Sequence, residues 1–189
     1  MKAEVALDRF QEAMSRVPCP VAVVTAMDGN RPHGTTVSAF CSLSADPPMV
    51  LVSLDKKSNL LEIIRRTGRF GINILALDQE PTAMACAQKG IDKFSNIDWE
   101  ERNEVPHILG TSAWFACDLQ DEQGGGDHVV LHGMCFDLDE WNVKSLYYYR
   151  RRFFSPGSQP AAGVGGNAIG RAIYQQPLDP VVSDRTRTS

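Results

Sequence analysis

Residues 33–59 read HGTTVSAFCSLSADPPMVLVSLDKKSN, and they lead from a strand pattern into a helix pattern. Met49 to Leu54 is a continuous apolar run, which is typical of a strand buried on both faces. Ser58 then stands at a favoured N-cap position, and Gly68 stands where a helix-ending glycine is expected. The apolar helix face between them is formed by Leu60, Leu61, Ile63 and Ile64. The stretch therefore predicts a buried strand followed by an amphipathic helix.

Upstream of this stretch, one helix and two strands are expected. Helical spacing of apolar residues predicts a first amphipathic helix, formed around Leu7, Phe10, Met14 and Val17. Pro18 and Pro20 end it. Strands are predicted over residues 21–25 and 35–40, and Asp28-Gly29-Asn30 between them indicates a turn.

Downstream, strand patterns alternate with loops. Strands are predicted over residues 70–75, 112–119, 128–138 and 147–154, with Gly124-Gly125-Gly126 connecting the second and third of them. Asp78 is expected to cap a short helix that continues to Lys89 and ends at Gly90. Residues 91–105 are expected to form an irregular polar loop that holds Phe94 and Trp99.

These elements predict a mainly β (α+β) fold. Six or seven strands, two or three helices and no regular βαβ alternation favour an antiparallel barrel with a few peripheral helices. A chain of 189 residues favours one folded domain, expected over residues 1–154. Residues 155–189 are rich in glycine and proline and are expected to form a flexible tail.

Composition argues against several classes of partner. The net charge of −4 gives no basic footprint for a nucleic acid or an anionic membrane. We expect no membrane span and no secretory peptide, because no apolar stretch approaches the required length. The five cysteines are widely spaced in apolar segments, which favours core thiols in a reducing cytoplasm. No CxxC pair is present to hold zinc, and no metal site is predicted.

Other chemical motifs fail on spacing or composition. A glycine-rich segment ending at Gly170 resembles a phosphate loop, but Arg171 and Ala172 stand where lysine and a hydroxyl residue are required. His128 and His132 are four residues apart on a predicted strand, which separates them by about 13 Å, too far to share a metal. No G-x-S-x-G nucleophile elbow occurs, so hydrolysis is disfavoured.

Three stretches together resemble the flavin reductase-like family, the reductase components of two-component flavin monooxygenases. The first is residues 33–54 followed by Lys57-Ser58-Asn59, and the second is Lys93-Phe94 before Trp99. The third is Gly126-Asp127-His128 followed by Gly133, with the segment from Leu146 to Arg150 further on. The similarity covers roughly residues 7–154, and it departs at Ser145 and Arg151, where proline and glycine are frequent in the family.

The resemblance implies a split β-barrel that binds FMN or FAD, normally as a homodimer with the flavin near the subunit interface. It implies that the edge of the flavin ring contacts Thr36, Val37 and Ser38. Ser53 and Leu54 would flank the ring and the ribityl chain. The flavin phosphate would be held by Lys57, Ser58 and Asn59.

The resemblance also implies residues on the other side of the cofactor. Lys93 and Phe94 would close over the flavin, and His128, Tyr149 and Arg150 would face the NADH or NADPH that donates the hydride. Independently of the family, Ser58 and Asn59 open a predicted helix whose first N–H groups favour a phosphate. From the residue pattern alone, a simple helix cap is the better interpretation of Ser58, and Phe94 and Trp99 read as loop anchors; only the resemblance favours the phosphate.

The implied activity is reduction of FMN or FAD by NADH or NADPH, and the reduced flavin would diffuse to a partner monooxygenase. The two cofactors carry this chemistry, so no catalytic side chain is assigned. Two alternatives remain. One is a flavin- or heme-binding barrel without activity, against which the intact Gly126-Asp127-His128 argues. The other is an oxidase like those acting on pyridoxamine phosphate, for which only Arg150–Arg152 form a basic cluster.

Overall fold

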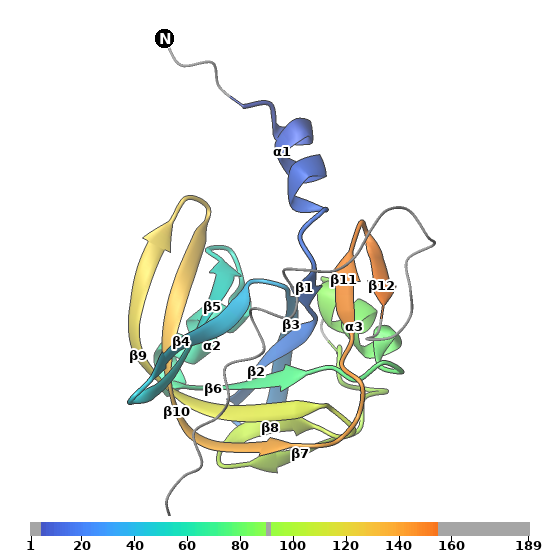
Figure 1. The fold of residues 1–189 in the computed structure, drawn as a ribbon. Helices are drawn as coiled ribbons and strands as arrows, with labels where there is room; N and C mark the ends of the chain where they lie inside the picture. Colours follow the sequence, from blue (N-terminus) through green and yellow to red (C-terminus); the bar gives the residue numbers. More distant parts are fainter. Residues whose placement is uncertain (1–4, 90–91, 155–189) are drawn as a thin grey trace, which may run out of the picture. The chain divides into compact units, whose positions relative to one another are not determined.

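The computed structural model describes residues 5–89 and 92–154, in which the chain forms twelve strands and three helices (Figure 1). The helices are α1 (Leu7–Met14), α2 (Asn59–Thr67) and α3 (Glu80–Ala87). The strands are β1 (Cys19–Pro20), β2 (Ala22–Asp28), β3 (Arg31–Val37), β4 (Phe40–Ala45), β5 (Pro48–Asp55), β6 (Arg69–Ile74), β7 (Trp99–Arg102), β8 (Val105–Ile108), β9 (Ala113–Gly125), β10 (His128–Glu140), β11 (Tyr147–Tyr149) and β12 (Arg152–Phe154). No helix of the described ranges has the length and apolar character that a bilayer crossing requires. The expected tail, residues 155–189, lies outside the described residues.

The main sheet has seven strands in the order β3-β2-β6-β9-β10-β5-β4, and every neighbouring pair is antiparallel. Its two edge strands, β3 and β4, are consecutive in the chain and are separated only by Ser38 and Ala39. The sheet must therefore curl until its two edges approach each other. The Ser53 backbone N–H donates to the Ala39 carbonyl oxygen at 3.0 Å, which ties this connection to β5. The prediction of a mainly β, antiparallel fold is confirmed.

Helix α2 packs on the principal core as its sequence predicts. Leu60, Leu61, Ile63 and Ile64 are all buried among apolar residues of β2, β5, β6 and β10. Gly68 ends the helix with φ of 72°, and its N–H donates to the Ile64 carbonyl at 2.8 Å. Only glycine adopts this left-handed conformation without strain, which explains why the helix ends there.

Three details of the predicted elements are wrong. The strand expected over residues 35–40 begins earlier, at Arg31, and ends at Val37, and a separate strand β4 follows. Strand β5 is not buried on both faces, because Val50, Val52 and Leu54 are buried while the residues between them are half-buried. At α3 the N-cap position belongs to Gln79 instead of Asp78, and the helix ends at Ala87, before Lys89.

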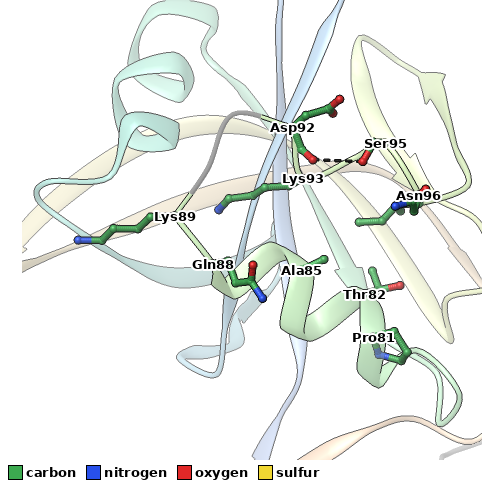
Figure 2. A pocket seen from close by; sticks show the side chains of 10 residues that line it. Pro81, Thr82, Ala85, Gln88, Lys89, Asp92, Lys93, Ser95 and Asn96 are labelled. Atoms are coloured by element: carbon green, nitrogen blue, oxygen red, sulfur yellow. Dashed lines mark hydrogen bonds between the residues drawn. The ribbon is translucent and has the colours of Figure 1, made fainter.

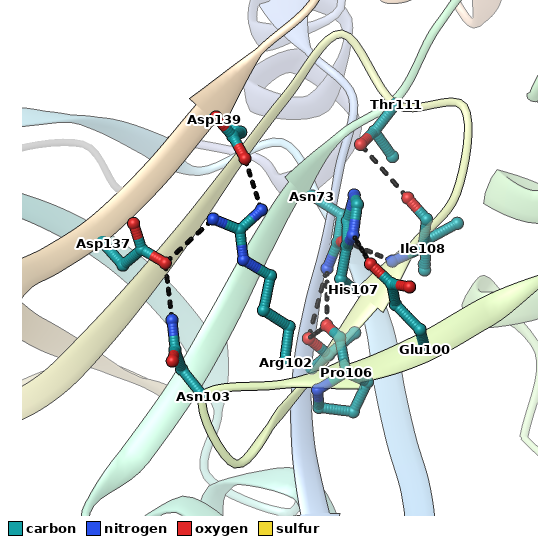
Figure 3. Close-up of polar contacts among 11 residues, drawn as sticks. Asn73, Glu100, Arg102, Asn103, Pro106, His107, Ile108, Thr111, Asp137 and Asp139 are labelled. Atoms are coloured by element: carbon teal, nitrogen blue, oxygen red, sulfur yellow. Dashed lines mark hydrogen bonds and ion pairs between the residues drawn. The ribbon is translucent and has the colours of Figure 1, made fainter.

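The hairpin β7–β8 lies where the sequence predicted an irregular loop. Figure 3 shows how ion pairs and hydrogen bonds attach it to the sheet. The Arg102 guanidinium donates to the carboxylates of Asp137, at 3.0 Å, and Asp139, both on β10. It also stacks 4.6 Å from the ring of Trp114, which is fully buried. The hairpin therefore covers one face of β9 and β10.

The last predicted strand is a hairpin of two short strands, β11 and β12. Arg150 and Arg151 form its two-residue turn with φ of 48° and 62°. Left-handed conformations at both positions define a type I′ turn, in which glycine is a preferred residue. Arg150 and Arg151 therefore adopt a conformation that is easier for glycine than for a residue with a Cβ.

We expect Gly133→Ala to lower the free energy of unfolding by about 1–3 kcal/mol, because the new methyl group is inserted into a packed core. A Cβ at Gly133 would lie 2.5 Å from Cζ of Phe70 and 3.0 Å from Cβ of Cys117, both fully buried. Gly124→Ala is the matched control, since a Cβ there meets nothing within 4 Å. Urea unfolding of both variants measures the difference, and equal midpoints would contradict the packing described here.

Candidate functional site

Two of the predicted site segments meet at the connection between the sheet edges. The first segment, Thr36 to Ser38, ends β3 and enters this connection, and Ser53 on β5 is hydrogen-bonded to it through Ala39. The Thr36 hydroxyl donates to the Ala83 carbonyl of α3 at 2.6 Å, so it is held by the helix. Ser38 is exposed, whereas Leu54 is buried in the principal core. The structure thus brings the first two segments together.

The N-terminus of α2 follows directly from β5. The Asp55 carboxylate accepts the Lys57 N–H at 2.7 Å, and the Asp55 carbonyl accepts the Ser58 N–H at 2.9 Å. Ser58 has the extended backbone of an N-cap residue, but its half-buried hydroxyl makes no capping hydrogen bond in the described structure. A helix N-terminus without a side-chain cap leaves backbone N–H groups available to an anion. Together with the exposed Lys57, this arrangement fits a phosphate.

His128 lies beside the same turn. It begins β10 directly opposite Asp55, and the Asp127 carbonyl accepts the Lys56 N–H at 3.0 Å. The Lys56 ammonium donates to the Gly126 carbonyl at 2.6 Å, which fixes the two turns against each other. The His128 ring nitrogen Nδ1 lies 2.8 Å from the Asp127 carboxylate, and this contact lowers the pKa of Asp127. The structure therefore places His128 next to the N-terminal turn of α2.

Lys93 and Phe94 are both attached to β3. The Lys93 ammonium donates to the carbonyl of Gly34 at 3.0 Å and to that of Cys86, in the last turn of α3, at 2.8 Å. Partial burial lowers the pKa of Lys93. Phe94 is buried in a second apolar cluster, which includes Val23 and Ile97. Its ring lies edge-on to Trp99 and closely approaches Gly34. These contacts are those of a loop anchor, and the closing role of both residues over a cofactor stays a prediction.

A pocket of about 410 Å³ lies between α3 and the following loop, as Figure 2 shows. It shares Lys93 with the predicted site. Its lining residues are Pro81, Thr82, Ala85, Gln88, Lys89, Asp92, Lys93, Ser95, Asn96 and Ile97. The sequence did not predict the other nine lining residues, because polar residues scattered over a short helix and a loop form no motif with regular spacing.

Tyr149 and Arg150 lie on the β11–β12 hairpin, which pairs with β1 in a separate three-stranded sheet. The Arg150 N–H donates to the Ser15 carbonyl at 2.7 Å, and its guanidinium lies 5.6 Å from the ring centroid of Tyr149. These contacts attach the pair to the segment after α1. Their assignment to the nicotinamide nucleotide stays a prediction.

Comparison with known proteins gives a consistent result. The sequence model of the family described as "Flavin reductase like domain" matches residues 14–157. A Rhizobium meliloti protein named "Probable flavin reductase" is 35% identical over 93% of this chain, which spans 59% of the length of that protein. The reductase component of a Rhodococcus opacus 4-nitrophenol 4-monooxygenase/4-nitrocatechol 2-monooxygenase is 34% identical, with 76% of this chain and 78% of that protein covered.

A solved structure agrees with these sequence matches. The NADH:FAD oxidoreductase of Streptomyces globisporus, in complex with NAD and FAD fragments, superposes with a TM-score of 0.76 at 26% identity. The superposition covers 83% of this chain and all of that one.

Proposed function

The chain belongs to the flavin reductase-like domain family, and from this premise we propose that it reduces FMN or FAD with NADH or NADPH. The observation that supports this most directly is the family match over residues 14–157, which includes all three motif stretches. The bound flavin supplies the hydride-accepting atom. The protein supplies binding and orientation, which is the larger part of such catalysis.

For the flavin phosphate, we assign Lys57, Ser58 and Asn59. The uncapped N-terminus of α2 and the free Ser58 hydroxyl support this assignment. Thr36, Val37 and Ser38 would contact the edge of the flavin ring, and Ser53 and Leu54 would flank it. The hydrogen bond from Ser53 to Ala39 supports grouping these two segments in one site.

We also propose that the seven-stranded sheet closes into a split barrel within a domain of residues 1–154. Support comes from the two-residue connection between its edge strands. The product would be free reduced flavin, consumed by a separate monooxygenase component.

An assay of nicotinamide oxidation tests the proposed activity. Purified protein is mixed with NADH or NADPH, and the nicotinamide absorbance is followed before and after addition of FMN or FAD. We expect consumption to begin only when flavin is added. Consumption that stays at the buffer rate with both flavins and both nicotinamides would overturn the proposal.

We expect a homodimer of about twice the 20.8 kDa chain mass. Helix α1 supports this expectation, because Leu7, Phe10 and Met14 are 70%, 55% and 47% exposed. Apolar side chains grouped on one helix face are typical of an interface. Light scattering at micromolar concentration, with flavin present, measures the mass, and a single-chain mass would contradict this expectation.

Ser58→Ala should weaken flavin binding about tenfold, which corresponds to the loss of one hydrogen bond to a charged group. The stability of the protein should change little, because the hydroxyl makes no capping hydrogen bond within the described structure. Quenching of flavin fluorescence measures the affinity. Asn142→Ala, at an exposed position outside the three motif stretches, serves as the control. Unchanged flavin affinity in Ser58→Ala would contradict the assignment of the flavin phosphate to this helix end.

A further inference from the structure

Cys117 and Cys135 lie directly opposite each other on the paired strands β9 and β10. Opposed residues of an antiparallel pair have Cα atoms about 4.5–5.5 Å apart, which falls inside the range of about 4.4–6.8 Å that a disulfide spans. Both side chains project to the same face, since Cys117 belongs to the principal core and Cys135 packs against it. The two sulfur atoms therefore lie on the same face of the sheet, and a bond can join them without either strand turning over.

The two thiols differ in their exposure to solvent. Cys117 is fully buried, whereas Cys135 is half-buried and its sulfur lies 3.4 Å from the Asp137 carbonyl. A register shift between Cys135 and Asp137 interrupts the ladder at this point. Such a bulge disrupts the local pairing and bends the strand. A small oxidant in solution therefore reaches Cys135 first.

The two thiols also differ in acidity. The neighbouring Cys117 thiol is the main cause that lowers the pKa of Cys135 below its usual value. The same contact, together with burial, raises the pKa of Cys117. A thiolate is the reactive form of cysteine toward oxidants. Cys135 thus has the properties of an attacking sulfur, and Cys117 is placed to resolve its sulfenic acid because it lies directly opposite.

We propose that Cys117 and Cys135 form a redox-active dithiol that hydrogen peroxide converts into a cross-strand disulfide. The Cys135 thiolate attacks one oxygen of peroxide, the O–O bond breaks, and a sulfenic acid and hydroxide form. The Cys117 thiol then attacks the Cys135 sulfur, the S–S bond forms, the S–O bond breaks, and the oxygen leaves as water. Two thiols lose two electrons and two protons, and one peroxide becomes two water molecules.

The proposed activity supplies the oxidant, because reduced flavin released into aerated solution reduces dioxygen to hydrogen peroxide. The dithiol stands on its own geometry, and its oxidation by added peroxide needs neither flavin nor nicotinamide. Failure of the dithiol and failure of the reductase activity are therefore separate results.

The test counts free thiols in the full chain. The protein is treated with one equivalent of hydrogen peroxide, denatured and alkylated with N-ethylmaleimide, and its intact mass is measured. We expect three alkylated cysteines in place of the five free thiols, with recovery of all five after dithiothreitol. Five alkylated cysteines after peroxide, or the loss of one thiol alone, would overturn the proposal.

Peptide mapping identifies the pair. Both cysteines lie in one tryptic peptide, residues 103–144, so a second cleavage after Glu122 is required to separate them. We expect the two halves to stay joined until reduction, and a link to any other cysteine would overturn the assignment. Cys41→Ser, which removes an exposed cysteine outside the pair, should still lose two thiols. In Cys117→Ser only the Cys135 thiol should be lost, and dimedone should trap it as a sulfenic acid. If this variant does not fold, the number of alkylated cysteines in the wild-type protein decides the test.

Discussion

Replacing Asn73 by alanine should lower the free energy of unfolding by about 2–4 kcal/mol, because buried polar groups would lose their partners. The Asn73 side chain is fully buried on β6. Its oxygen accepts the Ile108 N–H at 2.7 Å, and its amide nitrogen donates to the Val23 carbonyl and the Thr25 hydroxyl, each at 3.2 Å. The bond from Ile108, drawn in Figure 3, attaches strand β8 to β6, and the other two attach the side chain to β2. Without them the Ile108 N–H would stay buried and unsatisfied.

Thermal or urea unfolding measures this loss. Asn142→Ala is the matched control, since Asn142 is exposed and surface substitutions change stability by only about 0.5 kcal/mol. We also expect amide hydrogens of β7 and β8 to exchange faster in Asn73→Ala than those of α2. Equal stability of the two variants would contradict the stabilising role assigned to the Asn73 side chain.

Replacing His128 by alanine should lower kcat/KM for the nicotinamide roughly 5- to 150-fold, which corresponds to about 1–3 kcal/mol of transition-state stabilisation. The side chain is 45% exposed, so its imidazole is accessible to a ligand. Asp127 holds the ring through Nδ1 and leaves Nε2 to face solvent or a bound nucleotide. An orienting contact of this kind acts on the nicotinamide and leaves the affinity for flavin nearly unchanged.

His132→Ala is the matched control, because His132 lies on the same face of β10 and outside the three motif stretches. Steady-state kinetics with varied NADH, together with flavin fluorescence quenching, separates the two roles. Since His128 adjoins the turn before α2, weaker flavin binding with intact nicotinamide kinetics would reassign His128 to the flavin phosphate. Unchanged values of both would exclude it from the site.

The sequence predicted well those elements whose burial is visible within a few residues. Helix α2 has an apolar face and an ending glycine, and both act locally. The β7 strand reads Trp-Glu-Glu-Arg and carries no local strand pattern, since Arg102 is held by carboxylates of β10 far along the chain. Strand β4 is largely exposed and exists only because it pairs with β5. Long-range pairing of this kind leaves no periodic signal.

The family resemblance predicted which residues form the candidate site. It did not predict how these residues are arranged in space. The position of Ser58 at a helix start follows from local sequence. The approach of His128 to Asp55 depends on the register between β5 and β10, which is fixed by packing across the sheet. The anchoring of Lys93 to two backbone carbonyls could not be foreseen either, because carbonyl partners have no sequence signature.

Strand β10 joins the two halves of the main sheet, although it is one of the last strands in the chain. Strand β10 lies between β9 and β5, so a nascent chain that ends before His128 holds two incomplete sheets, β3-β2-β6-β9 and β5-β4. Each of them presents an unpaired edge until β10 leaves the ribosome and joins them. Contacts between distant segments slow folding, and unpaired edges are where intermediates aggregate. Synthesis of β10 is therefore the step that ends the period in which the newborn chain is exposed to aggregation.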